Sequence, residues 1–207
     1  MRELHSVNMP DVPTLPYRVE YTHPYAKDTF AEHLYIALHE YMPCSEMICV
    51  CIGTDRSTGD SLGPLVGTLL SREAPSHLKI YGTLDEPVHA INLSSTISHI
   101  NKEHPNALVI AVDACLGQYK SVGWIQVGLG PIKPGAGVNK NLPSIGKVHI
   151  TGIVNVAGFM EYFVLQNTRL SIVMNMAEVI SASIMKASIQ TKGPEPQTTR
   201  SLQQNYF

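Results

Sequence analysis

Two aspartates, Asp60 and Asp113, stand where buried strands of the sequence are expected to end. Asp113 closes the apolar run Ala107–Val112, and Asp60 ends the loop that follows the apolar run Met47–Ile52. In a parallel α/β sheet the carboxyl ends of the strands meet at one crevice, where ligands bind. Two carboxylates in one crevice repel each other and lose hydration, so one keeps its proton while the other ionises. The pair is therefore predicted to activate a water and to protonate a leaving group.

Other interpretations of these two acids stay open. Either Asp60 or Ser61 is also suited to capping the helix that follows, and Asp113 to capping the next turn. Gly53, Gly59 and Gly63 suggest a phosphate-binding loop around Asp60. The chain lacks both the Gly-x-Gly-x-x-Gly pattern and a Gly-Lys-Ser/Thr ending there, so nucleotide binding is not favoured.

Further candidate residues belong to loops. Asp55 shares the loop before Asp60, where it would either join the site or bind loop N–H groups. The segment Gly128–Leu142 is rich in glycine and proline, and a loop of this length in a compact domain is usually functional. Its glycines would let backbone approach a substrate closely. The residues predicted to bind the substrate are Asp55, Pro134, Gly135, Gly137 and Asn139.

The cysteines and the overall composition exclude several classes. Cys44, Cys49, Cys51 and Cys115 form no Cys-x-x-Cys and no zinc spacing, so they are expected to be reduced cytosolic thiols. Cys115 next to the second acid is a minor candidate for a nucleophile. The prediction therefore includes no metal and no other cofactor.

Charge and hydropathy patterns limit the partners and the compartment. The net charge of −2 gives no basic excess for direct binding of nucleic acid. The N-terminus lacks an apolar signal core, and no apolar run approaches the ~18 residues of a membrane span, so a cytoplasmic location is expected. The sequence leaves a homo-oligomer open.

Strands and helices alternate along the chain, which predicts one α/β domain with a mostly parallel sheet and helices on both faces. Residues 1–26 are expected to form an extended N-terminal arm, 27–190 the domain, and 191–207 a disordered tail. Helices are expected at 27–42, 61–70, 91–102 and 170–189. Strands are expected at 47–52, 78–81, 107–112, 123–127 and 148–154, with 123–127 antiparallel at an edge.

Several segments, in order along the chain, together resemble the spore germination proteases, which degrade small acid-soluble spore proteins. The segments are Ile52–Asp55, Gly59–Val66, Val109–Leu116, Ile125–Val127, Pro134–Lys140 and Ile150–Val154. The resemblance implies a hydrolase-like α/β fold (also described as phosphorylase-like) shared with hydrogenase maturation endopeptidases. It further implies an atypical aspartic-type catalytic pair, whose members fall on Asp60 and Asp113.

The sequence thus favours a sporulation-associated endopeptidase of the developing spore or mother cell. Its substrate would be a protein or peptide, with the small acid-soluble spore proteins as the candidate. The alternative is a catalytically inactive protein of the same fold that binds a peptide or protein partner during sporulation.

Overall fold

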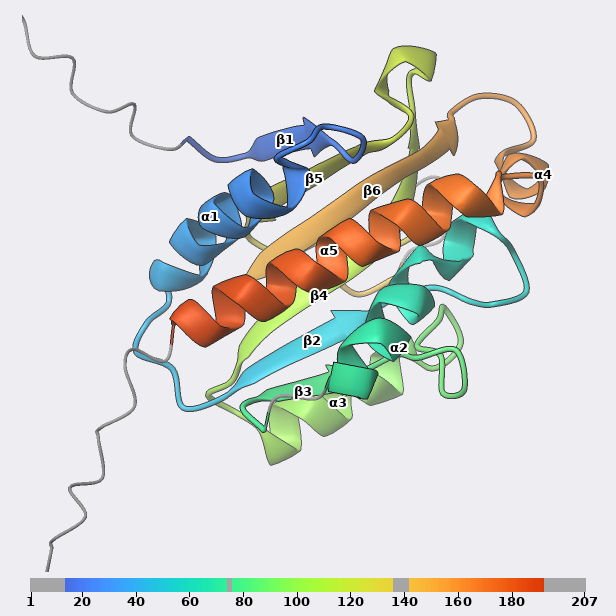
Figure 1. The fold of residues 1–207 in the computed structure, drawn as a ribbon. Coiled ribbons are helices and arrows are strands. Elements are labelled where there is room, and N and C mark those ends of the chain that lie inside the picture. The colour runs from blue at the N-terminus through green and yellow to red at the C-terminus, as the bar shows by residue number, and fades with distance from the viewer. Residues whose placement is uncertain (1–13, 74–75, 136–141, 192–207) are drawn as a thin grey trace, which may run out of the picture.

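The computed structural model describes residues 14–73, 76–135 and 142–191. A six-stranded sheet with the order β1-β5-β6-β4-β2-β3 forms its centre (Figure 1). The strands are β1 Tyr17–Glu20, β2 Met47–Cys51, β3 Leu78–Tyr81, β4 Leu108–Gly117, β5 Trp124–Leu129 and β6 Val148–Val156. Strands β3, β2, β4 and β6 pair in parallel, whereas β5 pairs antiparallel with both β6 and β1. The predicted mostly parallel α/β sheet is therefore confirmed.

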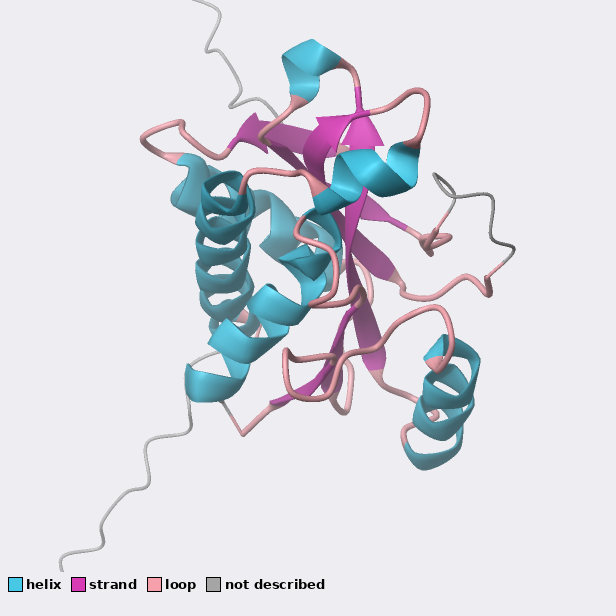
Figure 2. Ribbon diagram, turned by 90° about the vertical axis from the view of Figure 1, so that its right-hand side faces the viewer, coloured by secondary structure: helices cyan, strands magenta, loops and turns pink. Residues whose placement is uncertain are grey.

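Helices cover both faces of the sheet, as predicted. They are α1 Ala26–His39, α2 Leu62–Glu73, α3 Leu93–Glu103, α4 Glu161–Gln166 and α5 Leu170–Gln190, with a short 3-10 turn η1 at Gly59–Ser61. One face carries α5 between α1 and α2, and α3 lies by itself on the other face (Figures 1 and 2). Every residue of β2 is buried, because a central parallel strand is covered on both sides.

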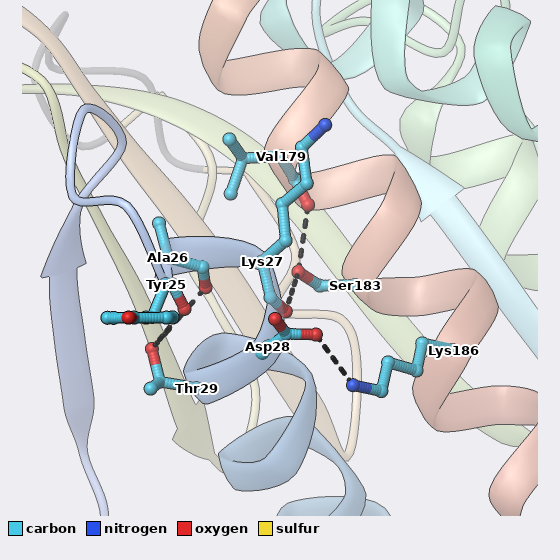
Figure 3. Close-up of polar contacts among 8 residues, drawn as sticks. All are labelled: Tyr25, Ala26, Lys27, Asp28, Thr29, Val179, Ser183 and Lys186. Carbon is cyan, nitrogen blue, oxygen red and sulfur yellow. Dashed lines mark hydrogen bonds and ion pairs between the residues drawn. The ribbon is translucent and has the colours of Figure 1, made fainter.

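Helix α5 is joined to α1 by packing and by two polar contacts (Figure 3). The fully buried hydroxyl of Ser183 lies 3.0 Å from the carbonyl oxygen of Lys27 and 2.8 Å from that of Val179, which share its proton. Lys186 Nζ forms an ion pair with Asp28 Oδ1 at 2.7 Å. By length and hydropathy α5 resembles a membrane span, but 56% of its most apolar window is buried inside the protein. Its apolar stripe is thus used in the core.

Strand β4 is longer than the sequence indicates. The apolar run was expected to end the strand at Val112, yet β4 continues to Gly117. Its neighbour β2 stops opposite Val112, but β6 remains paired with β4 as far as Gly117. The prediction that Asp113 follows the strand is therefore wrong, and so is the alternative that it caps a turn there. Asp113 lies inside β4, paired in register with Thr151.

Strand β5 is antiparallel as predicted, but it is not an edge strand. Residues Tyr17–Glu20, which fall within the expected extended arm, form β1 and pair along the outer side of β5. The guanidinium of Arg18 also lies 5.3 Å from the centre of the Trp124 ring, a cation–π distance. Strand β1 has only four residues, and three of them are charged or polar. Its sequence therefore has no apolar pattern from which a strand could be predicted.

Candidate active site

A tight turn after β2 brings Asp60 back over the end of that strand. Gly53 has a φ of +146°, and a Cβ there would collide with the backbone carbonyl oxygen of Asp60. The backbone N–H of Thr54 donates to the same carbonyl at 3.1 Å. Only glycine permits this close approach, so the residue type at position 53 determines where Asp60 lies.

Asp113 reaches the same place from the sheet. The residue is 6% exposed, and its Oδ1 accepts a hydrogen bond from the N–H of Ala114 at 3.0 Å. The two strands beside β4 end at different points: β2 stops opposite Val112, one position before Asp113, whereas β6 continues past it. Asp113 therefore faces a step in the sheet rather than the end of its own strand.

Both aspartates line one cavity of about 440 Å³. The other lining residues come from β4, from the loop after β5 and from the segment around α4: Ala114, Cys115, Leu116, Ile132, Lys133, Gly135, Ala157, Glu161 and Leu165. A larger hollow of about 590 Å³ lies between α1, α2 and α5, where the carboxylates of Glu73 and Glu178 accompany lysines and apolar side chains. We locate the candidate site at the smaller cavity, because it holds the two acids at the carboxyl side of the parallel strands.

The environment of Asp113 favours its protonated form. Burial is the main cause that raises its pKa well above the ordinary range of an aspartate, and the negative charge of Asp60 raises it further. The hydrogen bond from Ala114 acts in the opposite direction but is the smaller effect. Burial and the neighbouring carboxylate of Asp60 thus both favour the protonated form of Asp113.

Cys115 does not have the properties of a nucleophile. Burial is the first cause that raises the pKa of its thiol, to about 11, and the second is the charge of Asp113 in the alkaline range where the thiol titrates; a hydrogen bond with Thr151 acts in the opposite direction. At neutral pH almost none of the thiol is therefore ionised, and the thiolate is the reactive form. The raised pKa argues against the minor interpretation of Cys115 as a nucleophile.

The structure brings together some of the predicted substrate-binding residues and not others. Gly135 lines the cavity, and Pro134 beside it is buried. Asp55 is exposed on its loop, where it accepts a hydrogen bond of 3.4 Å from Thr54 Oγ1, and it is not among the cavity-lining residues that the structure describes. Gly137 and Asn139 lie outside the described residues.

Sequence analysis missed two charged residues of the cavity, Lys133 and Glu161. Lys133 directly precedes Pro134 and Gly135, which the sequence predicts to bind the substrate. Its position beside them could therefore have indicated that it belongs to the site. Glu161 begins α4, a helix of six residues, which is too short to give a helical pattern in the sequence. Among residues 14–73, 76–135 and 142–191, no group of three or more His, Cys, Asp or Glu side chains is placed to hold a metal ion.

Comparison with known proteins found a curated protein and a solved structure that are similar to this chain. Over 138 residues the chain is 62% identical to the uncharacterized protein YyaC of Bacillus subtilis (strain 168), and the match covers 67% of each protein. Among solved structures, the [NiFe] hydrogenase maturation protease HycI from Thermococcus kodakarensis KOD1 is similar with a TM-score of 0.47 and 16% identity. That match covers 77% of this chain and 96% of the other.

The relation to the spore germination proteases stays a prediction, because none of these comparisons names that family. A family model does match residues 18–183, which include most of β1, both aspartates and most of α5. The chain therefore belongs to the family described as "Protein of unknown function (DUF1256)".

Proposed function

We propose that this protein is an endopeptidase that uses Asp60 and Asp113 to hydrolyse a peptide bond. The observation that supports this most directly is the raised pKa of Asp113 beside the charged Asp60 in one cavity. Two carboxyl groups that differ in protonation can divide the roles of acid and base between them. The family resemblance of the surrounding segments points to the same chemistry.

In the proposed reaction Asp60 is the base and Asp113 is the acid. The Asp60 carboxylate accepts a proton from a water molecule as its oxygen attacks the peptide carbonyl carbon. The Asp113 carboxyl group donates its proton to the carbonyl oxygen, which forms a tetrahedral intermediate. Collapse of the intermediate breaks the C–N bond, and the proton held by Asp60 passes to the departing amine. Each carboxyl group returns to its starting state when the product acid returns a proton to Asp113.

This division of roles predicts a bell-shaped dependence of activity on pH. Activity rises as Asp60 loses its proton and falls as Asp113 loses its own, so the raised pKa of Asp113 sets the alkaline limb. Because the two groups interact, the two apparent pKa values belong to the pair.

The proposed setting is the cytoplasm of a sporulating cell, in the developing spore or the mother cell. The proposed substrates are small acid-soluble spore proteins, as the resemblance to germination proteases implies. Neither nucleic acid nor membrane is a proposed partner, and association of two or more copies of the chain is compatible with this function.

The test is incubation of the purified protein with small acid-soluble spore proteins between about pH 5 and pH 8. Asp60→Asn and Asp113→Asn should each abolish cleavage. The control Asp85→Asn, which removes an exposed carboxylate that does not line the cavity, should not. Defined fragments from the wild type and from Asp85→Asn alone would establish the peptidase. Intact substrate that nevertheless binds would refute catalysis and favour the alternative, a non-catalytic protein that binds its partner in the same cavity.

A further inference from the structure

One edge of β4 has no neighbouring strand over its last five residues in the part of the chain that the structure describes. On the β2 side, pairing ends with Cys51 opposite Val112, and the N–H of Ile52 donates to the carbonyl of Val112 at 2.7 Å. The chain then turns away, because the N–H of Gly53 donates instead to Val88 at 2.8 Å. On its other side β4 stays paired with β6 as far as Gly117.

The backbone groups of Ala114 and Leu116 face this free edge. In a strand, the N–H and C=O groups of alternate residues point to the same side. Since the carbonyl of Val112 points toward β2, those of Ala114 and Leu116 point the same way. The irregularity in the ladder does not disturb this pattern, because the additional residue, Val154, belongs to β6. The N–H of Ala114 is bonded to Asp113 Oδ1, whereas the carbonyl of Ala114 and both backbone groups of Leu116 have no backbone partner among the residues that the structure describes.

The free edge opens into the cavity of the candidate active site. Ala114 and Leu116 are half-buried, and both line that cavity. Two other lining residues close it from opposite faces of the sheet. Leu165 packs with the core on the α5 face, and Ile132 packs with the core on the α3 face. The cavity therefore lies level with the sheet, which is where an additional strand would lie.

Free strand edges promote pairing with other chains, and proteins usually block them with charges, prolines or covering segments. An extended peptide that joins such an edge gains main-chain hydrogen bonds that do not depend on its sequence. A helix or a nucleotide cannot provide the repeating donors and acceptors of a strand. An extended polypeptide is therefore the ligand that matches the exposed groups of β4.

We propose that an extended segment of a partner polypeptide binds as an added strand along Ala114–Gly117. The segment takes the position beside β4 that β2 occupies before Gly53, and its backbone passes next to Asp113. The side chains of the segment point alternately toward α4, where Glu161 lies, and toward the loop that carries Lys133. This inference deepens the proposed peptidase function, on which it rests for the chemistry at Asp113, and it names an extended, unfolded stretch of protein as the substrate.

A tethered peptide tests strand addition without requiring a known substrate. The peptide is attached to a cysteine introduced by Glu161→Cys. The same protein carries Cys44→Ser and Cys115→Ser, so that attachment occurs at one site, and Asp60→Asn, so that the peptide stays intact. A short peptide of alternating threonine and valine is attached, and amide hydrogen exchange is followed by NMR. The matched control is the same peptide N-methylated at every residue, because the methyl groups prevent its backbone from closing against the edge of a strand.

The plain peptide should slow exchange at the Leu116 amide by about tenfold or more, because that N–H gains a partner. The N-methylated peptide should leave it unchanged, and the amide at position 115, which faces β6, should not respond to either peptide. Unchanged exchange at Leu116 with the plain peptide, or equal slowing with both peptides, would overturn the inference. Protection of Leu116 in the tethered variant, together with no cleavage by the wild-type protein, would instead refute the peptidase and leave strand addition supported.

Discussion

Replacing Asp113 with asparagine should stabilise the protein at neutral pH, although it removes a proposed catalytic group. Burial raises the pKa of Asp113, so folding forces it to hold a proton that the unfolded chain would release. Between the ordinary pKa and the raised one, the folded state binds more protons than the unfolded state. The free energy of unfolding therefore falls as the pH rises through that interval. Asparagine keeps the shape and the oxygen that accepts from Ala114, but it has no proton to lose.

The size of the effect follows from linkage. Each unit by which folding raises the pKa lowers the free energy of unfolding by about 1.4 kcal/mol. At pH 7 the largest loss is about 4 kcal/mol, because an aspartate in an unfolded chain has a pKa of about 3.9. In a domain of this size 1 kcal/mol shifts the unfolding midpoint by about 2–4 °C. Each unit of pKa thus corresponds to a rise in Tm of about 3–6 °C in Asp113→Asn.

Denaturant unfolding of the wild type and Asp113→Asn between about pH 4 and pH 8 measures this effect. The two proteins should be equally stable near pH 4, and the advantage of the variant should grow as the pH rises. Asp85→Asn controls for the loss of one carboxylate at an exposed position and should differ from wild type by less than about 0.5 kcal/mol at every pH. If Asp113→Asn is instead less stable at every pH, the carboxyl group serves the fold and the argument from its burial fails.

Three further outcomes can be checked with single substitutions. Cys115 should react slowly with iodoacetamide at neutral pH. Asp113→Asn should move the pH dependence of its alkylation to lower pH, because the charge of Asp113 raises the pKa of that thiol. An unchanged pH dependence would show that Asp113 does not affect the thiol. Gly63→Ala should lower the free energy of unfolding by about 1–3 kcal/mol, since the new Cβ would collide with the backbone carbonyl of Ile52 where α2 meets β2, and an unchanged denaturation midpoint would contradict this close packing. Met160→Gly should raise the free energy of unfolding by about 1 kcal/mol, because Met160 has a φ of 61° and its side chain is half exposed; a lower denaturation midpoint would show that the side chain stabilises the loop before α4.

Local patterns in the sequence were sufficient for the order and type of most elements. The run Met47–Ile52 is apolar throughout because β2 is covered on both faces, and such a run is recognisable without knowing its neighbours. The helix after Asp60 and the long helix α5 likewise have apolar stripes that meet the core. Gly53, which follows this apolar run, indicates a turn, and that turn brings Asp60 back toward the sheet.

The tertiary structure decided what the two acids face. The length of β4 depends on pairing with β6, which is distant in sequence, and so the location of Asp113 inside the strand could not be read from Ala107–Val112. The different ends of β2 and β6 create the step that buries Asp113 and leaves the edge at Leu116 free. Burial and the nearby charge of Asp60 then raise the pKa of Asp113, because both depend on distances between segments and not on local sequence. The sequence alone determined that two carboxylates would reach the same region of an α/β sheet, and long-range strand pairing decided which of them keeps its proton.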